Sequence, residues 1–208
     1  MAALEIGSRS FTKRVVSDNA CNARVAIAQS EEYEEYYCVL HTFNLVIRDC
    51  FKEDVLSVSI TSVKKKCKEL ARWVRKSGNV KPDVSKACKS VGIKPIFPIN
   101  PNDTRWHSTH DNISSIVTLR PALLHLSNQQ DAWREKVLYP NEYTLAEAMA
   151  SLLKKVKICC KELEADKSAT MQLVVSSIYN LTEHLVDVQR ESKDECTTEF
   201  AWVQLKSI

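Results

Sequence analysis

The chain has 208 residues, of which 44% are hydrophobic and 26% are charged, and its net charge is +3. This composition is typical of a globular protein with a real core, and the charge neither requires nor excludes a nucleic-acid partner. The chain contains only three glycines, and this low number argues against a turn-rich all-β protein. No apolar run approaches the roughly 18 residues of a membrane span, and the start MAALEIGSRSFTKR lacks the apolar region of a signal peptide. We therefore expect a soluble, intracellular protein.

The first part of the chain predicts alternating strands and helices. Residues 14–17 are expected to form a short strand that ends before Asp18, and residues 20–30 a helix. A second short strand is expected near residues 36–38, leading into the apolar helix VLHTFNLVIRDCF. This order is typical of an α/β layer.

From about residue 54 the pattern becomes helical. One apolar stripe recurs at steps of three and four residues, the period of a helix with one buried face: Leu56, Ile60, Val63, Cys67, Leu70, Ala71 and Val74. The opposite side is mostly basic, with Lys64, Lys65, Lys68, Glu69 and Arg72. Gly78-Asn79 is expected to cap this helix.

Further helices are expected in the second half. They cover residues 81–92, residues 104–128 with a kink at Pro121, and segments containing residues 145–163 and 171–188. The eight cysteines include no CxxC pair, so the strong structural-zinc pattern is absent. We expect reduced thiols, most of them small core residues.

Two short motifs place polar side chains beside the predicted strands. Asp18 directly follows a strand end, where α/β sheets position ligand or metal groups, but it is also a good helix N-cap, which residue chemistry alone favours. Cys38 and His41 are three residues apart and share a helix face. With His107 and His110 they could complete a four-ligand metal site; the plainer alternative is a buried thiol and a hydrogen-bonded imidazole.

The segment DTRWHST, residues 103–109, joins a proline-rich loop to a helix. Free N–H groups at a helix start suit a phosphate, and Arg105 can pair with phosphate or stack on a base. Trp106 offers a π-face whose stacking on a base contributes about 1–3 kcal/mol. Alternatively, Trp106 anchors the helix in the core and Arg105 pairs with a nearby acid.

Taken in order, four segments resemble the central part of a hAT-superfamily transposase: VVSDNACNARVA, CVLHTFNLVIRD, TRWHSTHDNI and LEADKSATMQLVVSSIYNLTEHL. The first three are similar to the family's Asp-Asn-x-x-Asn, Cys-x-x-His-x-x-Asn-Leu and Thr-Arg-Trp-x-Ser elements. The resemblance implies an α-rich α/β fold. A partial RNase H-like core would occupy residues 1–53, a helical insertion residues 54–190, and a tail residues 191–208.

The resemblance also implies roles for individual residues. Asp18 matches the second carboxylate of the family's DDE set, which holds Mg²⁺, and His41, with Cys38, matches an element beside that active site. Arg105 and Trp106 match residues that handle the DNA end, the tryptophan near a flipped base. The implied partners are DNA, bound weakly and with low specificity, and a full-length transposase-like protein. The implied location is the nucleus.

The first and third carboxylates of the family's set have no counterpart in this sequence, and one carboxylate would hold Mg²⁺ weakly. We therefore expect a truncated or domesticated hAT-transposase-like protein that binds nucleic acid, is catalytically incomplete and holds no stable Mg²⁺. The alternative is a helical protein-interaction module that kept the fold without DNA binding. DNA binding requires one surface formed by Lys64, Lys65, Lys68, Arg72, Arg75 and Arg105. A nuclease with unrecognised carboxylates is the third option.

The first prediction concerns catalysis. The purified chain is expected not to cleave or join DNA in Mg²⁺ or Mn²⁺, because two-metal chemistry needs more than one carboxylate. A gel assay on supercoiled plasmid tests this directly. Metal-dependent nicking that Asp18→Ala abolishes would contradict the prediction.

Overall fold

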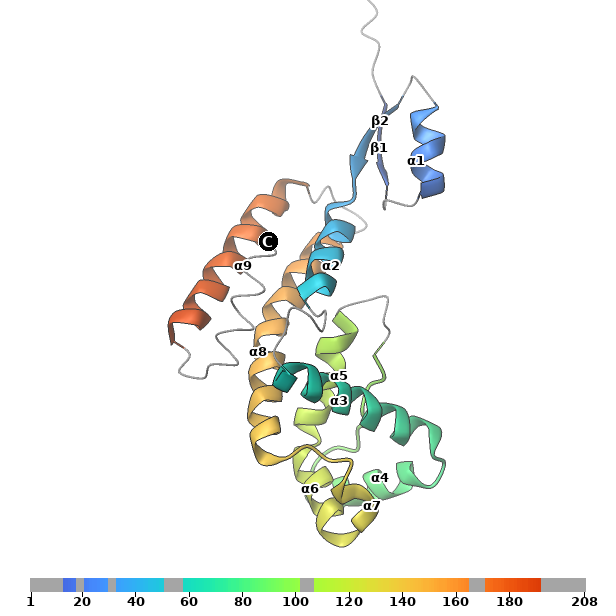
Figure 1. The fold of residues 1–208 in the computed structure, drawn as a ribbon, viewed down its shortest axis with the longest axis vertical. Coiled ribbons are helices and arrows are strands. Elements are labelled where there is room, and N and C mark those ends of the chain that lie inside the picture. Colours follow the sequence, from blue (N-terminus) through green and yellow to red (C-terminus); the bar gives the residue numbers. More distant parts are fainter. Residues whose placement is uncertain are drawn as a thin grey trace, which may run out of the picture. The chain divides into compact units, whose positions relative to one another are not determined.

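The computed structural model describes residues 13–17, 21–29, 33–50, 58–101, 107–164 and 171–191. The contacts within the chain divide it into two units, Met1–Phe43 and Asn44–Ile208. The described residues are mostly helical, with two short parallel strands in the first unit (Figure 1). The expectation of a mostly helical chain with a few short strands is confirmed. The boundary between the units falls inside a helix, whereas the boundary expected from the sequence lies between residues 53 and 54.

The first unit contains a strand–helix–strand arrangement. Strand β1 (Lys13–Ser17) pairs in parallel with β2 (Tyr33–Tyr37), with Val15 opposite Glu35, and helix α1 (Cys21–Ala28) contacts both strands. Parallel neighbours need a crossover of roughly a dozen residues, which α1 and the residues on either side of it supply. The expected strand and helix are confirmed. The second strand begins earlier than expected, because tyrosines suited to strands flank its two glutamates.

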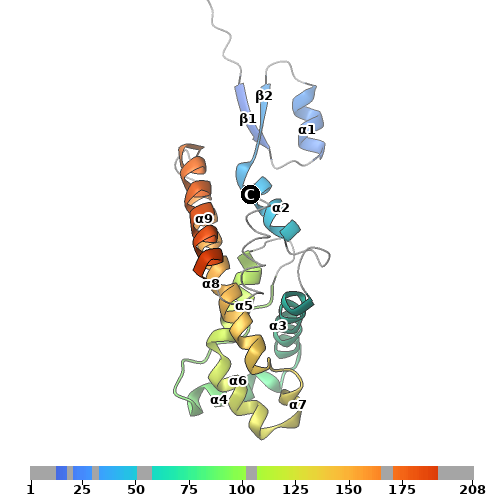
Figure 2. The same cartoon turned by 60° about the vertical axis from the view of Figure 1, so that its left-hand side comes forward.

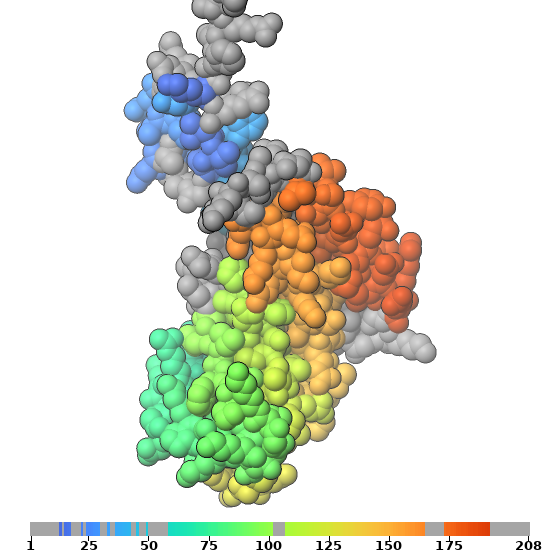
Figure 3. Space-filling model, turned by 180° about the vertical axis from the view of Figure 1, so that it is seen from behind, coloured from blue at the N-terminus to red at the C-terminus, as the bar shows by residue number. Residues whose placement is uncertain are grey.

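Helix α2 (Val39–Cys50) follows the second strand, and the division between the units falls within it. The described helices of the second unit are α3 (Val58–Lys76), α4 (Val80–Ser90), α5 (His107–Thr118), α6 (Arg120–Gln129), α7 (Asp131–Arg134), α8 (Pro140–Leu163) and α9 (Met171–Glu191). Helix α8 contacts α3, α5 and α9, while α6 contacts α4 and α7 (Figure 2). Seen from behind, α8 and α9 run side by side (Figure 3).

The core of the second unit follows the helical period of the sequence. The stripe expected on α3 is buried from Ile60 to Val74, and Leu56 lies outside the described residues. Trp73 of α3 meets Trp133 of α7 edge to face, with ring centroids 4.6 Å apart. On α9 the apolar side chain of Val175 is 78% exposed. Ser177, Leu181 and Leu185, four residues apart, set the buried face of that helix.

Two turns differ in detail from their expected form. The chain turns at Gly78-Asn79, but of the two glycines within the described residues it is Gly92 that takes a left-handed φ, of 73°. Gly92 ends α4 in a Schellman motif, in which the Ile93 N–H donates to the Cys88 carbonyl at 2.9 Å. The helix expected over residues 104–128 is broken at Leu119, because Pro121 fits the first turn of a new helix but not the interior of a continuous one.

A buried asparagine holds the loop between α4 and α5 in place. The side-chain amide of Asn112, 2% exposed, donates to the Ile99 carbonyl at 2.7 Å and to the Cys67 carbonyl of α3 at 3.3 Å. The Ile99 N–H donates to the hydroxyl of Ser115 at 3.0 Å. Both backbone groups of Ile99 are therefore satisfied by α5 side chains, and the loop is tied to α3 as well.

Replacing Asn112 by alanine should destabilise the second unit by about 1–3 kcal/mol, because the two hydrogen bonds from its buried amide to the Ile99 and Cys67 carbonyls would be lost. The matched control is Asn128→Ala on the exposed side of α6, which should change stability by less than about 0.5 kcal/mol. Urea unfolding followed by circular dichroism measures both. Equal stability of the two variants would show that the asparagine bridge contributes nothing.

Candidate nucleic-acid interface

The carboxyl ends of the two strands meet at one edge of the small sheet. The Ser17 carbonyl accepts a hydrogen bond from the Cys38 N–H at 2.8 Å, directly after β2. Cys38 directly precedes helix α2, and its carbonyl accepts the Thr42 N–H at 3.0 Å; His41 lies in the first turn. Cys38 and His41 are both half-buried. Asp18, the candidate carboxylate, lies outside the described residues.

The described side chains at this edge do not suit Mg²⁺. Magnesium prefers oxygen ligands in octahedral order, whereas Cys38 offers sulfur and His41 offers nitrogen. No group of three or more His, Cys, Asp or Glu residues that could hold a metal ion occurs in the described part of the chain. Cys38 and His41 belong to the first unit, and His107 and His110 to the second. The described side chains of this edge therefore do not by themselves support a step through Mg²⁺.

Helix α5 begins directly after the Arg105-Trp106 element, which itself lies outside the described residues. Asp111, in the second turn of α5, accepts hydrogen bonds from Lys157 of α8 and from His110 Nδ1, the latter at 3.0 Å. The three side chains are only 12–29% exposed. Burial acts to raise the pKa of Asp111, but the hydrogen bonds from Lys157 and His110 outweigh it and lower that pKa. The cluster fixes the start of α5 against α8.

The positive charge of the chain is concentrated in residues 58–101. This segment holds eleven of the 29 lysines and arginines but only two of the 26 acids, Glu69 and Asp83. Eight of its basic side chains are exposed: Lys65, Arg72, Arg75, Lys76, Lys81, Lys86, Lys89 and Lys94. A net charge of +3 for the whole chain therefore conceals a strongly positive segment opposed by acids elsewhere.

On α3 the exposed charges form a stripe. Lys65, Arg72 and Lys76 are spaced by seven and four residues, so they share the face opposite the buried stripe. The stripe spans about 16 Å at 1.5 Å per residue, the length of about five phosphates of one DNA strand. Of the set expected from the sequence, Lys65, Arg72 and Arg75 are exposed, while Lys64 and Lys68 are half-buried.

Lys66, next to Lys65 of the stripe, is engaged within the fold. Lys66 forms an ion pair with Glu142 of α8 at 2.6 Å and lies 4.5 Å from the centroid of the Tyr139 ring. Its flank of α3 therefore faces α8. The same flank carries Trp73, which meets α7, so the stripe and Arg75 lie on the remaining sides of the helix.

Sequence reasoning missed the basic residues of α4 and of the following loop. The signal was available, because counting charges by segment rather than over the whole chain separates residues 58–101 from the rest. Sequence reasoning also missed the hydrogen-bonded ion pair between Asp111 and Lys157. The two residues are 46 positions apart and meet only because α5 packs on α8.

Comparison with known proteins adds no assignment. No family model matches this sequence, and no curated protein matches it. No helix in the described ranges is long and apolar enough to cross a membrane. What the chain does has to be inferred from its own residues and their placement.

The stability contributed by Asp111 should depend on pH. Because its pKa is lowered on folding, the stabilisation is present above the unfolded value of about 3.9 and is lost as pH falls through the lower folded value. Asp111→Asn should therefore lower the urea midpoint at pH 7, and the difference from the unaltered chain should shrink below about pH 4. Asp131→Asn, at a side chain 91% exposed, is the control. If the difference in urea midpoint between Asp111→Asn and the unaltered chain stays constant from pH 7 to pH 3, the ionised Asp111 carboxylate is not the source of the stabilisation.

Proposed function

We propose that this chain is a hAT-transposase-like protein that binds nucleic acid and is catalytically incomplete. The observation that carries the proposal is the concentration of exposed basic side chains on α3, α4 and the loop that follows. A surface of this kind attracts phosphates and releases the counterions that nucleic acid holds, which favours binding in dilute salt.

The first unit supports the transposase-like part of the proposal. Its parallel β1–α1–β2 order is the arrangement in which a carboxylate directly after the first strand stands at a ligand-binding edge. Asp18 occupies that position in the sequence, and Cys38 follows the second strand. The proposal includes an RNase H-like core, in which Asp18 corresponds to a carboxylate that binds a divalent metal in the family.

The binding itself is expected to be weak and independent of base sequence. The exposed lysines and arginines contact phosphates, which carry no sequence information. Arg105 is assigned to a phosphate near the start of α5, and Trp106 to the face of an unpaired base. Affinity should lie in the range of about 10⁻⁴–10⁻⁶ M at physiological salt that is typical of non-specific binding.

Neutralising the α3 stripe together with Arg75 tests the proposal. We expect the combined variant Lys65→Gln, Arg72→Gln, Arg75→Gln and Lys76→Gln to weaken binding to a fluorescent duplex. The slope of log affinity against log salt should fall by about 0.9 for each phosphate that the variant no longer neutralises. The matched control places four glutamines on exposed sites of α8 and α9, at Lys154, Lys155, Lys161 and Arg190, which changes the net charge equally.

Two results would contradict nucleic-acid binding at this surface. Equal reductions of affinity in the two charge variants would show that only net charge matters. No binding by the unaltered chain even at low salt would favour the alternative, a helical module that interacts with proteins.

The role of Trp106 can be separated from a structural one. Trp106→Ala should weaken binding to DNA with unpaired bases by roughly five- to 150-fold, the equivalent of one base stacked on an aromatic ring, and should weaken duplex binding less. A thermal melt of the same variant distinguishes the alternative, because truncating a core tryptophan costs about 3–5 kcal/mol. Severe destabilisation without selective weakening of unpaired-DNA binding would assign Trp106 to the core.

A further inference from the structure

The three most exposed large hydrophobic side chains of the described residues lie on two helices. They are Val58 at the start of α3, 86% exposed, and Val175 and Tyr179 in the first half of α9, 78% and 63% exposed. A single exposed apolar residue is common on a protein surface and carries little by itself. On both helices, however, the exposed apolar side chains are followed by exposed charges that are mostly of one sign, basic on α3 and acidic on α9.

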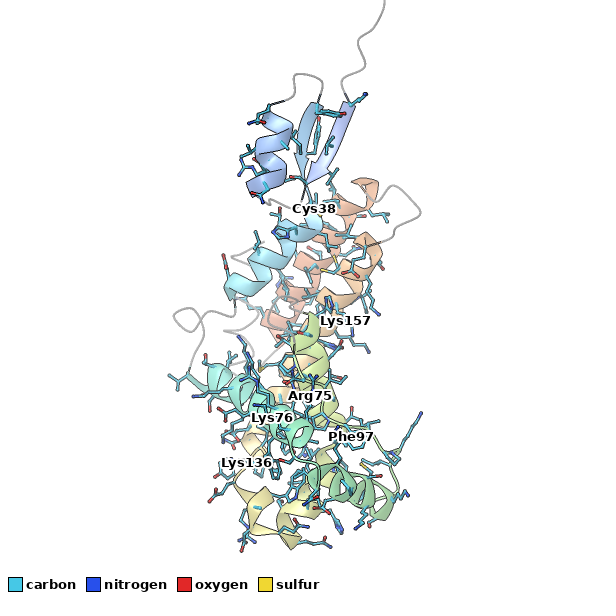
Figure 4. The ribbon with its side chains drawn as sticks, turned by 90° about the vertical axis from the view of Figure 1, so that its right-hand side faces the viewer. Cys38, Arg75, Lys76, Phe97, Lys136 and Lys157 are labelled. Carbon is cyan, nitrogen blue, oxygen red and sulfur yellow. The ribbon has the colours of Figure 1, made fainter. Side chains whose placement is uncertain are left out.

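On α3 the apolar and basic side chains share the outer face. Val58, Lys65 and Arg72 are spaced by seven residues, so they lie in one line opposite the buried stripe. At 1.5 Å per residue, Lys65 and Arg72 lie about 11 Å and about 21 Å beyond Val58. Lys76 continues the line to the end of the helix (Figure 4). The outer face of α3 is therefore apolar at its start and basic farther on.

Helix α9 has the opposite charge in the same order. Its buried face, which includes Leu181 and Leu185, packs on α8. Outside that contact, a row of exposed side chains at four-residue steps forms the kind of ridge that packs between helices. This row, called the α9 ridge, consists of Val175, Tyr179, Glu183, Asp187 and Glu191. The ridge is apolar at its start and acidic farther on.

The two faces do not meet within one chain. Helix α8 contacts both α3 and α9 and lies between them in Figures 1 and 2. The charged and apolar side chains of both faces are exposed. Each face is therefore accessible to another molecule.

Laid side by side in the same direction, the two faces match in spacing as well as in charge. Glu183 and Glu191 lie about 9 Å and about 21 Å beyond the midpoint between Val175 and Tyr179. These intervals are close to those that separate the cations of α3 from Val58. The matched sets are Val58 with Val175 and Tyr179, Lys65 with Glu183, and Arg72 with Glu191.

The exceptions to the charge pattern also match. Glu69 is the only acid of α3, and Arg190 is the only lysine or arginine of α9; both are exposed. Glu69 lies about 17 Å beyond Val58, and Arg190 about 20 Å beyond the same midpoint on α9. With about 3.6 residues per turn, Glu69 and Asp187 fall on opposite flanks of a parallel helix pair, so Arg190 is the nearer charge.

We propose that the outer face of α3 in one copy of this chain binds the α9 ridge of a second copy. The inference goes beyond the proposed function and does not rest on it. Because the two faces differ, the contact is heterologous and links copies into rings or chains. A single helix pair is smaller than a standard interface, and exposed ion pairs contribute little each, so the association should be weak and sensitive to salt.

The α3 stripe takes part in both proposals. Lys65 and Arg72 are assigned to phosphates under the proposed function and to carboxylates of a second copy here. Nucleic acid and a second copy would therefore compete for the same cations. The test of self-association uses the chain freed of nucleic acid, so its result does not depend on whether the chain binds DNA.

The experiment is a charge exchange, measured by sedimentation velocity of the full chain at increasing concentration in low salt. The unaltered chain should self-associate, and high salt should disperse it. Lys65→Glu and Glu183→Lys should each weaken association about tenfold or more, because like charges then oppose one another. The chain that carries both changes should associate as the unaltered chain does, since the pair is restored in reverse.

Two controls separate the pairing from net charge and from general hydrophobicity. Lys136→Glu combined with Glu183→Lys has the same net charge as the exchanged pair but changes an exposed lysine outside α3, so it should not restore association. Tyr179→Ser should weaken association, whereas Phe97→Ser, at a side chain 42% exposed on neither helix, should not. Circular dichroism of each variant establishes that the helices are retained.

Three outcomes would overturn the inference. The first is an unaltered chain that remains monomeric at every concentration in low salt. The second is an exchanged pair, Lys65→Glu with Glu183→Lys, that associates no better than the more weakened single variant. The third is association that neither the charge variants nor Tyr179→Ser weakens, which would assign it to another surface.

Discussion

The side-chain amide of Asn112 is the constraint that joins the loop after α4 to both α3 and α5. Its two N–H groups reach the Ile99 carbonyl of a loop without regular structure and the Cys67 carbonyl inside α3. The helical carbonyl has a second lone pair to offer, so the bridge does not require α3 to give up a backbone bond. The amide of Asn112 is itself buried and would be costly without acceptors, so the two carbonyls satisfy it while it fixes the loop. The part of the loop at Ile99 is consequently tied to α3 and α5.

The charges of the second unit divide into two groups with different roles. Lys66 and Lys157 are paired with Glu142 and Asp111, and these pairs join α3 and α5 to α8. The lysines and arginines of the α3 stripe are exposed and lie beside one another, an arrangement that lowers stability through repulsion. The buried stripe of α3 and the Trp73–Trp133 contact stabilise the helix despite that repulsion. The exposed lysines and arginines of the α3 stripe are therefore accessible to a polyanion.

The sheet edge and the basic face offer different chemistry. At the edge, the parallel pairing brings the ends of β1 and β2 together, and the described donors are a thiol and an imidazole. Such an edge can position ligands but, with these donors, does not suit a hard divalent cation. The basic face needs no metal and no precisely placed donor, because phosphate binding depends mainly on charge density. Nucleic-acid binding without catalysis is what we propose for this chain.

The sequence by itself determined most of the helices and the buried face of α3, since a 3.6-residue period of apolar residues can be satisfied only by burying one face. It also determined the strand–helix–strand order at the start. Only the tertiary structure decided that Val175 is exposed, that Asp111 pairs with Lys157, and that Asn112 joins a loop to α3. These facts depend on contacts between residues far apart in the chain, and neither local propensity nor periodicity contains that information, because it arises when the helices pack.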